Sequence, residues 1–113
     1  MAWVRLGSLT ELEVDSGQRV ELSDDDAVAL IRTEDAVYAL VDCCTHEEYP
    51  LSEGFVEEDK VECVLHGSRF DLATGHPDIP PAVAPVRTFP VKVDGDDVLV
   101  DLPERWAELA ESL

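Results

Sequence analysis

Basic residues are scarce in this chain of 113 residues: eight lysines and arginines face 26 aspartates and glutamates, which gives a formal net charge of −18. Such a charge argues against nucleic acid and anionic membrane surfaces as partners, because their phosphates would repel the protein. Long hydrophobic runs are also missing, and the longest one, at residues 36–41, is too short to cross a bilayer. We therefore expect neither a nucleic-acid-binding protein nor a membrane protein.

The start of the chain lacks the basic and then apolar pattern of a secretory signal, and acidic residues appear from Glu11 onward. Cysteine is scarce as well, and the three cysteines are an odd number. A chain without an export signal should keep them reduced, so we interpret them as metal ligands or core thiols. The length fits one domain over residues 1–113, and a hydrophobic share of 45% is ordinary for a globular protein. We expect a single cytoplasmic domain.

Apolar runs separated by turn residues predict a mostly β fold. Strands are expected at residues 2–6, 18–22, 28–32, 37–41, 91–93 and 98–100. The strands 28–32 and 37–41 are almost continuously apolar, which predicts a hairpin buried on both faces, and the last two strands predict a second hairpin. Residues 8–11 have capping-box spacing, in which Ser8 caps a helical turn and Glu11 reaches back.

The middle of the chain, about residues 42–90, is rich in Cys, His, Gly and Pro, and only 60–64 and 69–72 resemble short strands. An irregular stretch of this length inside a compact domain is usually functional. We expect the site to lie there.

The last residues, about 103–113, predict a helix. Pro103 suits the first helical position, and Glu104 complements the positive end of the helix. One face carries apolar side chains at helical spacing: Trp106, Leu109, Ala110 and Leu113. We expect this face to pack on its own domain, with a partner-binding helix as the alternative.

Two short motifs carry candidate metal ligands: Cys44-Thr45-His46 and Cys63-Val64-Leu65-His66. Each offers one thiolate and one imidazole on a tight loop. Structural zinc also accepts two cysteines and two histidines, but zinc modules usually pair Cys with Cys and His with His. Mixed pairs on two loops favour a site with two metal ions, one held by sulfur and one by nitrogen.

These motifs, with the flanking segments 50–54, 70–75 and 80–82, resemble the Rieske-type ferredoxins, small [2Fe–2S] electron carriers of bacterial ring-hydroxylating oxygenases. The resemblance covers about residues 3–102. It implies an antiparallel β-sandwich with an inserted, loop-rich cluster-binding subdomain at about 42–90 and a short C-terminal helix.

The resemblance also assigns the ligands of one [2Fe–2S] cluster. Cys44 and Cys63 would hold one iron, and His46 and His66 would hold the other. Two histidines in place of two cysteines raise the reduction potential above that of an all-cysteine cluster.

Several neighbouring residues bear on the reduction potential. High-potential Rieske proteins join their loops by a disulfide, but the corresponding residues here are Tyr49 and Leu65, and Phe70 replaces a tyrosine hydroxyl donor. Ser68 either donates a hydrogen bond to the cluster or is a plain turn serine. Acidic residues 47–48 directly follow a ligand, and nearby negative charge lowers the potential. We predict roughly −150 mV, the low end of the Rieske range.

Two further candidates lie beside the motifs. Cys43 adjoins Cys44 and is an alternative ligand, although we interpret it as a half-buried residue at the end of a strand. His76 sits between Gly75 and Pro77, where we expect an exposed side chain without a role at the cluster.

The resemblance implies a one-electron carrier rather than an enzyme, passing electrons from a flavin-dependent, NAD(P)H-oxidising reductase to a terminal non-heme iron oxygenase. We expect a monomer that docks through an apolar tip at Leu65, Pro80 and Pro81. The acidic surface either selects basic partners or keeps the domain soluble. A carrier or accessory protein of another pathway, such as iron–sulfur assembly, and a nitrite-reductase small-subunit-like module remain alternatives.

Overall fold

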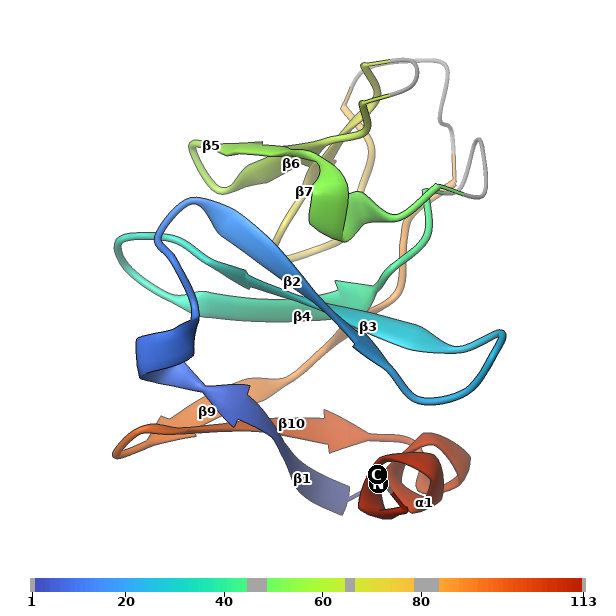
Figure 1. The fold of residues 1–113 in the computed structure, drawn as a ribbon. Helices are drawn as coiled ribbons and strands as arrows, with labels where there is room; N and C mark the ends of the chain where they lie inside the picture. The colour runs from blue at the N-terminus through green and yellow to red at the C-terminus, as the bar shows by residue number, and fades with distance from the viewer. Residues whose placement is uncertain (1, 45–48, 65–66, 79–83, 113) are drawn as a thin grey trace.

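The computed structural model describes residues 2–44, 49–64, 67–78 and 84–112. Within them, the strands form three antiparallel sheets stacked in layers, and one α-helix lies at the end of the chain (Figure 1). This confirms the predicted antiparallel β architecture with a short C-terminal helix. No helix in the described ranges is long and apolar enough to span a membrane.

The strands are short, and most of them pair with the strand that precedes or follows them in the sequence. The first sheet has the order β1–β10–β9, with β1 at Ala2–Ser8, β10 at Asp97–Leu102 and β9 at Val91–Asp94. The second has the order β2–β3–β4–β8, at Ser16–Glu21, Ala27–Arg32, Val37–Val41 and Thr88–Phe89. The third has the order β5–β6–β7, at Phe55–Glu57, Lys60–Glu62 and Arg69–Asp71.

Strand β3 is buried on both faces because its side chains alternate between two hydrophobic cores. Val28 and Leu30 join the core between the second sheet, the first sheet and the helix. Ala29 and Ile31 join the core between the second and third sheets. The predicted hairpin 28–32 and 37–41 is confirmed, and its middle position explains why its strands are almost continuously apolar.

Helix α1, at Glu104–Glu111, packs on the first core as predicted, and Trp106 lies against the ring of Phe89 with centroids 5.5 Å apart. The expectation that Pro103 begins the helix is wrong. Its ψ of 152° is extended, and its carbonyl accepts the first helical hydrogen bond, from the Ala107 N–H at 2.8 Å. Leu113 lies outside the described residues.

The predicted helical turn is present as the 3₁₀ turn η1, at Leu9–Glu11, but the capping box is wrong. Asp96, in the turn between β9 and β10, accepts a hydrogen bond from the Ser8 hydroxyl and another from the Thr10 N–H at 2.9 Å. A carboxylate from the far end of the chain therefore caps this turn, and Ser8 serves as its donor.

The middle segment contains more regular structure than the sequence indicates. Strands β6 and β7 confirm the two predicted strands, each shorter at its end, while β5, β8 and a second 3₁₀ turn, η2 at Leu51–Glu53, were not predicted. In Figure 1 the sheet β5–β6–β7 lies at the opposite end of the molecule from α1. The region expected to hold the site is thus a third layer.

Candidate metal centre

Two of the four predicted ligands, Cys44 and Cys63, are described, and both are buried. Cys44 follows the end of β4 with 2% of its surface exposed, and Cys63 follows β6 with 1% exposed. Both belong to the core between the second and third sheets. Strands from two different layers therefore deliver the two thiols to one apolar core.

The two cysteines begin loops that close in the same way. The Cys44 N–H donates to the Tyr49 carbonyl at 2.9 Å, and the Cys63 N–H donates to the Ser68 carbonyl at 2.8 Å. In both loops the hydrogen bond joins residue i to residue i+5. The predicted ligands His46 and His66 fall inside these loops by sequence and lie outside the described residues, as do Leu65, Pro80, Pro81 and the acidic pair 47–48.

Glycine allows the second loop to turn. Gly67 has a φ of +74°, where an L side chain is strained, and its N–H donates to the Cys63 carbonyl at 3.0 Å. Ser68 next to it is fully buried, and so is Phe70. The loop therefore carries a buried hydroxyl at the position where the sequence leaves a choice between a hydrogen-bond donor to the cluster and a turn serine.

The described donors fit the sulfur side of an iron–sulfur cluster. Two buried cysteines among apolar side chains offer soft ligands shielded from water, and Cys thiolates are the ligands that hold such clusters. No disulfide joins any of the three cysteines, all of which are described. Within the described ranges no group of three or more His, Cys, Asp or Glu side chains comes together as a metal site. The two thiols alone therefore supply half of the predicted ligand set.

Two cations on the strands that flank the second loop pair with one carboxylate. Strands β6 and β7 pair Glu62 with Arg69 directly beside the loop. Asp78 contacts Lys60 on β6, and Arg69 on β7 at 3.5 Å. The hydrogen bond from Lys60 is the largest cause that lowers the pKa of Asp78, and the charges of both cations lower it further. The ion pairs therefore fasten the chain after β7 to the strands that carry Cys63.

The first loop is braced by a carboxylate that sequence reasoning missed. Asp42 lies between β4 and Cys44, and its side chain has no exposed surface. It accepts hydrogen bonds from the Ser52 N–H and the Ser52 hydroxyl, both at 2.6 Å, and from Arg19 at 3.1 Å. The one signal in the sequence is a charged residue placed directly after an apolar strand.

The other two candidates lie where the sequence predicts. Cys43 is half-buried, and its thiol contacts the Cys44 carbonyl at 3.6 Å. His76 is exposed, and its carbonyl accepts a hydrogen bond from the Asp71 N–H at 2.9 Å. Whether either side chain acts at the cluster stays a prediction.

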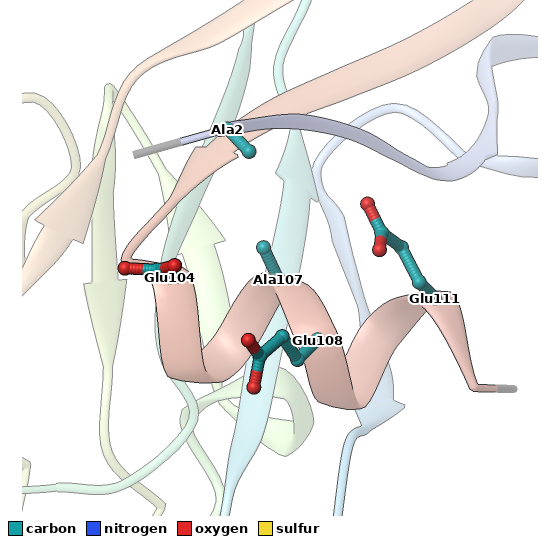
Figure 2. A pocket seen from close by; sticks show the side chains of 5 residues that line it. All are labelled: Ala2, Glu104, Ala107, Glu108 and Glu111. Atoms are coloured by element: carbon teal, nitrogen blue, oxygen red, sulfur yellow. The ribbon is translucent and has the colours of Figure 1, made fainter.

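A hollow of about 450 Å³ lies far from these loops, between the start of β1 and helix α1 (Figure 2). Its wall consists of two alanines and three glutamates: Ala2, Glu104, Ala107, Glu108 and Glu111. Neither Cys44 nor Cys63 lines it. The candidate metal centre is thus separate from this hollow.

Each of the two loops is closed by a hydrogen bond between residues i and i+5, and each begins with a cysteine buried in the same core. A comparison of the whole chain with protein families agrees with this arrangement. Residues 2–90 match the family described as Rieske [2Fe-2S] domain. The chain belongs to the Rieske family. Its cofactor is accordingly a Rieske [2Fe–2S] cluster.

Relatives of this Rieske domain are components of dioxygenase systems. The chain is 52% identical over 65 residues to the ferredoxin component of biphenyl 2,3-dioxygenase from Rhodococcus jostii, a match that covers 58% of this chain and 61% of the relative. It is 39% identical over 93 residues to the 3-phenylpropionate/cinnamic acid dioxygenase ferredoxin subunit of Shigella boydii, covering 81% of this chain and 88% of the relative.

A solved structure has the same fold. It is a complex of reduced oxygenase and oxidized ferredoxin in carbazole 1,9a-dioxygenase, and one of its chains superposes on this Rieske domain with a TM-score of 0.81 and 33% identity. The match covers 87% of this chain and 91% of the other.

Proposed function

We propose that this Rieske domain is the ferredoxin of a multicomponent oxygenase, a one-electron carrier that performs no bond chemistry itself. The observation that carries the proposal is the burial of Cys44 and Cys63 at the starts of two equally closed loops. The dioxygenase ferredoxins among its relatives support the oxygenase as the acceptor.

The proposed ligands are Cys44 and Cys63 for one iron, and His46 and His66 for the other. When bound, the cluster supplies a site that takes up and releases one electron. With two thiolates and two neutral imidazoles the oxidised site has no net charge, whereas four thiolates would leave it at −2. A neutral site accepts an electron more readily, which accounts for the higher potential of Rieske centres.

The protein around this site has two tasks. The apolar core keeps water away from the thiol side, with Leu51, Val61 and Phe70 all fully buried beside the cysteines. The closed loops fix the directions of both cysteines before the cluster binds.

We further propose two partners: a flavin-dependent ferredoxin reductase as the electron donor and a terminal non-heme iron oxygenase as the acceptor. The relative in the carbazole 1,9a-dioxygenase complex supports the oxygenase, because that structure holds an oxygenase and a ferredoxin together. A net charge of −18 favours partners with basic docking faces. We expect the carrier to act as a monomer.

The test is anaerobic purification followed by metal analysis and spectroscopy of the wild type and of two matched variants. We expect two irons and two acid-labile sulfides per chain, a coloured oxidised form and a Rieske EPR signal after reduction with dithionite. Cys44→Ser should abolish the signal, whereas Cys43→Ser, at the adjacent thiol, should leave it intact. A colourless protein that holds zinc would overturn the proposal, and loss of the signal in Cys43→Ser would overturn the ligand assignment.

Electron transfer is tested separately. Dithionite-reduced protein is mixed anaerobically with the oxidised oxygenase of a reconstituted dioxygenase system, and the visible spectrum is followed in a stopped-flow instrument. Reoxidation within the turnover time of the oxygenase supports the assigned role. A cluster-loaded protein that the oxygenase cannot reoxidise would point to a carrier of another pathway.

A further inference from the structure

The two ligand loops differ in how their ends are held. The second loop sits on a hairpin: β6 and β7 pair Glu62 with Arg69 on either side of it, so a ladder fixes both ends. The first loop leaves β4 after Val41 and reaches η2 at Leu51. Among the described residues, no ladder joins these two ends to each other.

The Asp42 carboxylate replaces the missing ladder. It accepts two hydrogen bonds from Ser52, one from the backbone N–H and one from the hydroxyl, both at 2.6 Å. These bonds join Asp42, just after β4, to Ser52 within η2. The Cys44–Tyr49 hydrogen bond lies inside this closure. The first loop is thus closed twice, by an outer side-chain clamp and an inner backbone hydrogen bond.

The clamp is itself anchored to the rest of the domain. The Asp42 N–H donates to the Ala27 carbonyl at 3.0 Å, and Arg19 on β2 donates to the carboxylate at 3.1 Å. On the other side, a Cβ at Gly17 would lie 2.8 Å from the Ser52 carbonyl oxygen, so the backbone of β2 presses against Ser52. Both halves of the clamp therefore rest on the second sheet.

Bulk water cannot replace the hydrogen bonds that the buried Asp42 carboxylate accepts. The Asp42 side chain has no exposed surface, so no bulk water can take over a lost hydrogen bond. A buried carboxylate that loses its donors is costly, and without Ser52 the Asp42 carboxylate would lose two of the three hydrogen bonds that it accepts. The backbone must then move, and Cys44 lies only two residues away.

We propose that Asp42 is a positioning residue for the cluster: it holds the first ligand loop, and with it Cys44, through its clamp on Ser52. This inference rests on the proposed function, because it assigns Cys44 as a ligand. Groups behind the direct ligands orient them, and their loss typically weakens metal binding about 10- to 100-fold.

The test compares Asp42→Asn and Ser52→Ala with a matched control, Asp26→Asn. Asp26 is also a largely buried carboxylate that accepts from a serine hydroxyl and an arginine, Ser23 and Arg105, both at 3.0 Å. It lies between β2 and β3, and its side-chain partners Ser23 and Arg105 belong to neither ligand loop. Asp42→Asn puts an amide NH₂ where one carboxylate oxygen accepts two hydrogen bonds, and Ser52→Ala removes only the hydroxyl.

Three quantities are measured on cluster-loaded protein: the rate of cluster loss into excess EDTA, the EPR g-values of the reduced form, and the thermal midpoint. We expect cluster loss to be about tenfold or more faster in Asp42→Asn. Ser52→Ala should show a smaller increase, and both variants should have shifted g-values. Asp26→Asn should lower the thermal midpoint but leave both cluster readouts at wild-type values.

The outcomes separate the two proposals. A wild type without a [2Fe–2S] cluster would overturn the proposed function. A normal wild-type cluster, with Asp42→Asn matching Asp26→Asn in loss rate and g-values, would overturn the positioning role alone. If Asp42→Asn does not fold, Ser52→Ala decides: wild-type loss rate and g-values refute the clamp, and faster loss with shifted g-values supports it.

Discussion

Replacing Gly75 with alanine should damage this domain far more than the same change at Gly95, although both residues have positive φ. Gly75 has a φ of +80° and Gly95 a φ of +63°. A Cβ at Gly95 would meet nothing within 4 Å, whereas a Cβ at Gly75 would lie 2.0 Å from the Val86 carbonyl oxygen. Only Gly75 therefore combines an unfavourable conformation with a collision against backbone.

The expected magnitudes follow from these two contributions. The left-handed conformation costs an L residue roughly 1–2 kcal/mol, and reduced freedom of the unfolded chain offsets part of it, so Gly95→Ala should cost about 1 kcal/mol. At Gly75 the backbone must also shift, which costs about 1–3 kcal/mol more. The shift strains two hydrogen bonds worth about 1 kcal/mol each: Gly75 N–H to the Asp71 carbonyl at 2.7 Å, and Val86 N–H to the Gly75 carbonyl at 2.9 Å. We expect roughly 3–5 kcal/mol in total.

The assay is thermal unfolding of cluster-loaded protein, followed by far-UV circular dichroism at one scan rate. For a domain of about this size, 1 kcal/mol shifts the midpoint by about 4–8 °C. Gly95→Ala should therefore lose about 4–8 °C, and Gly75→Ala more than about 12 °C. Val86 lies in the core of the two cysteines, so Gly75→Ala should also release its cluster faster. Midpoints of the two variants within about 3 °C of each other would refute the reasoning.

Three further predictions concern the cores, acid and salt. Leu51→Ala and Leu102→Ala, at two fully buried leucines, should each cost about 2–5 kcal/mol in urea denaturation, but only Leu51→Ala should speed cluster loss into EDTA, and equal rates would contradict the two-core description. The Ser8 hydroxyl and then the Thr10 N–H lower the pKa of Asp96 below its ordinary 3.8, so the native state binds fewer protons there than the unfolded chain. Asp96→Asn should thus lower the thermal midpoint above about pH 4, and the difference should vanish as the pH falls through the folded pKa; a pH-independent difference would contradict this linkage. Electron transfer to the oxygenase should slow as NaCl rises from about 0.05 to about 0.3 M, because salt screens a charge of −18; an unchanged rate would argue against charge-guided docking.

The sequence predicts the hairpin strands β3 and β4 because buried strands are almost entirely apolar, and this composition is visible in the sequence. Both strands face a core on each side, so almost every position must be apolar. The short strands β5 and β8 carry no such pattern. β5 has three residues and places Phe55 at its start with 66% exposure, and β8 has only two residues. Strands this short are defined by their neighbours, which a single sequence does not reveal.

The candidate site divides in the same way. Cys44 and Cys63 can be picked out from the sequence because each is followed within three residues by a histidine, a pairing of two metal-binding residue types. Asp42 and Ser52 cannot, because their partnership forms only when η2 folds back onto β2. Their side chains are common in loops and turns, and nothing in their spacing predicts a buried clamp.

The −18 charge combines carboxylates with two different roles. Asp42, Asp78 and Asp96 each accept hydrogen bonds from other segments of the fold, Asp42 as a buried side chain and the other two at the surface, so neutralising them should change stability. Other carboxylates come from three separate turns and line one shared hollow of about 340 Å³: Asp15, Glu34, Asp35, Glu57, Glu58 and Asp59. Because their charges face solvent rather than donors in the core, they act mainly on the long-range field that a basic partner meets. Substituting the turn carboxylates should therefore reduce the salt dependence of docking with little loss of stability. Substituting Asp42, Asp78 or Asp96 should lower stability and change the salt dependence of docking less.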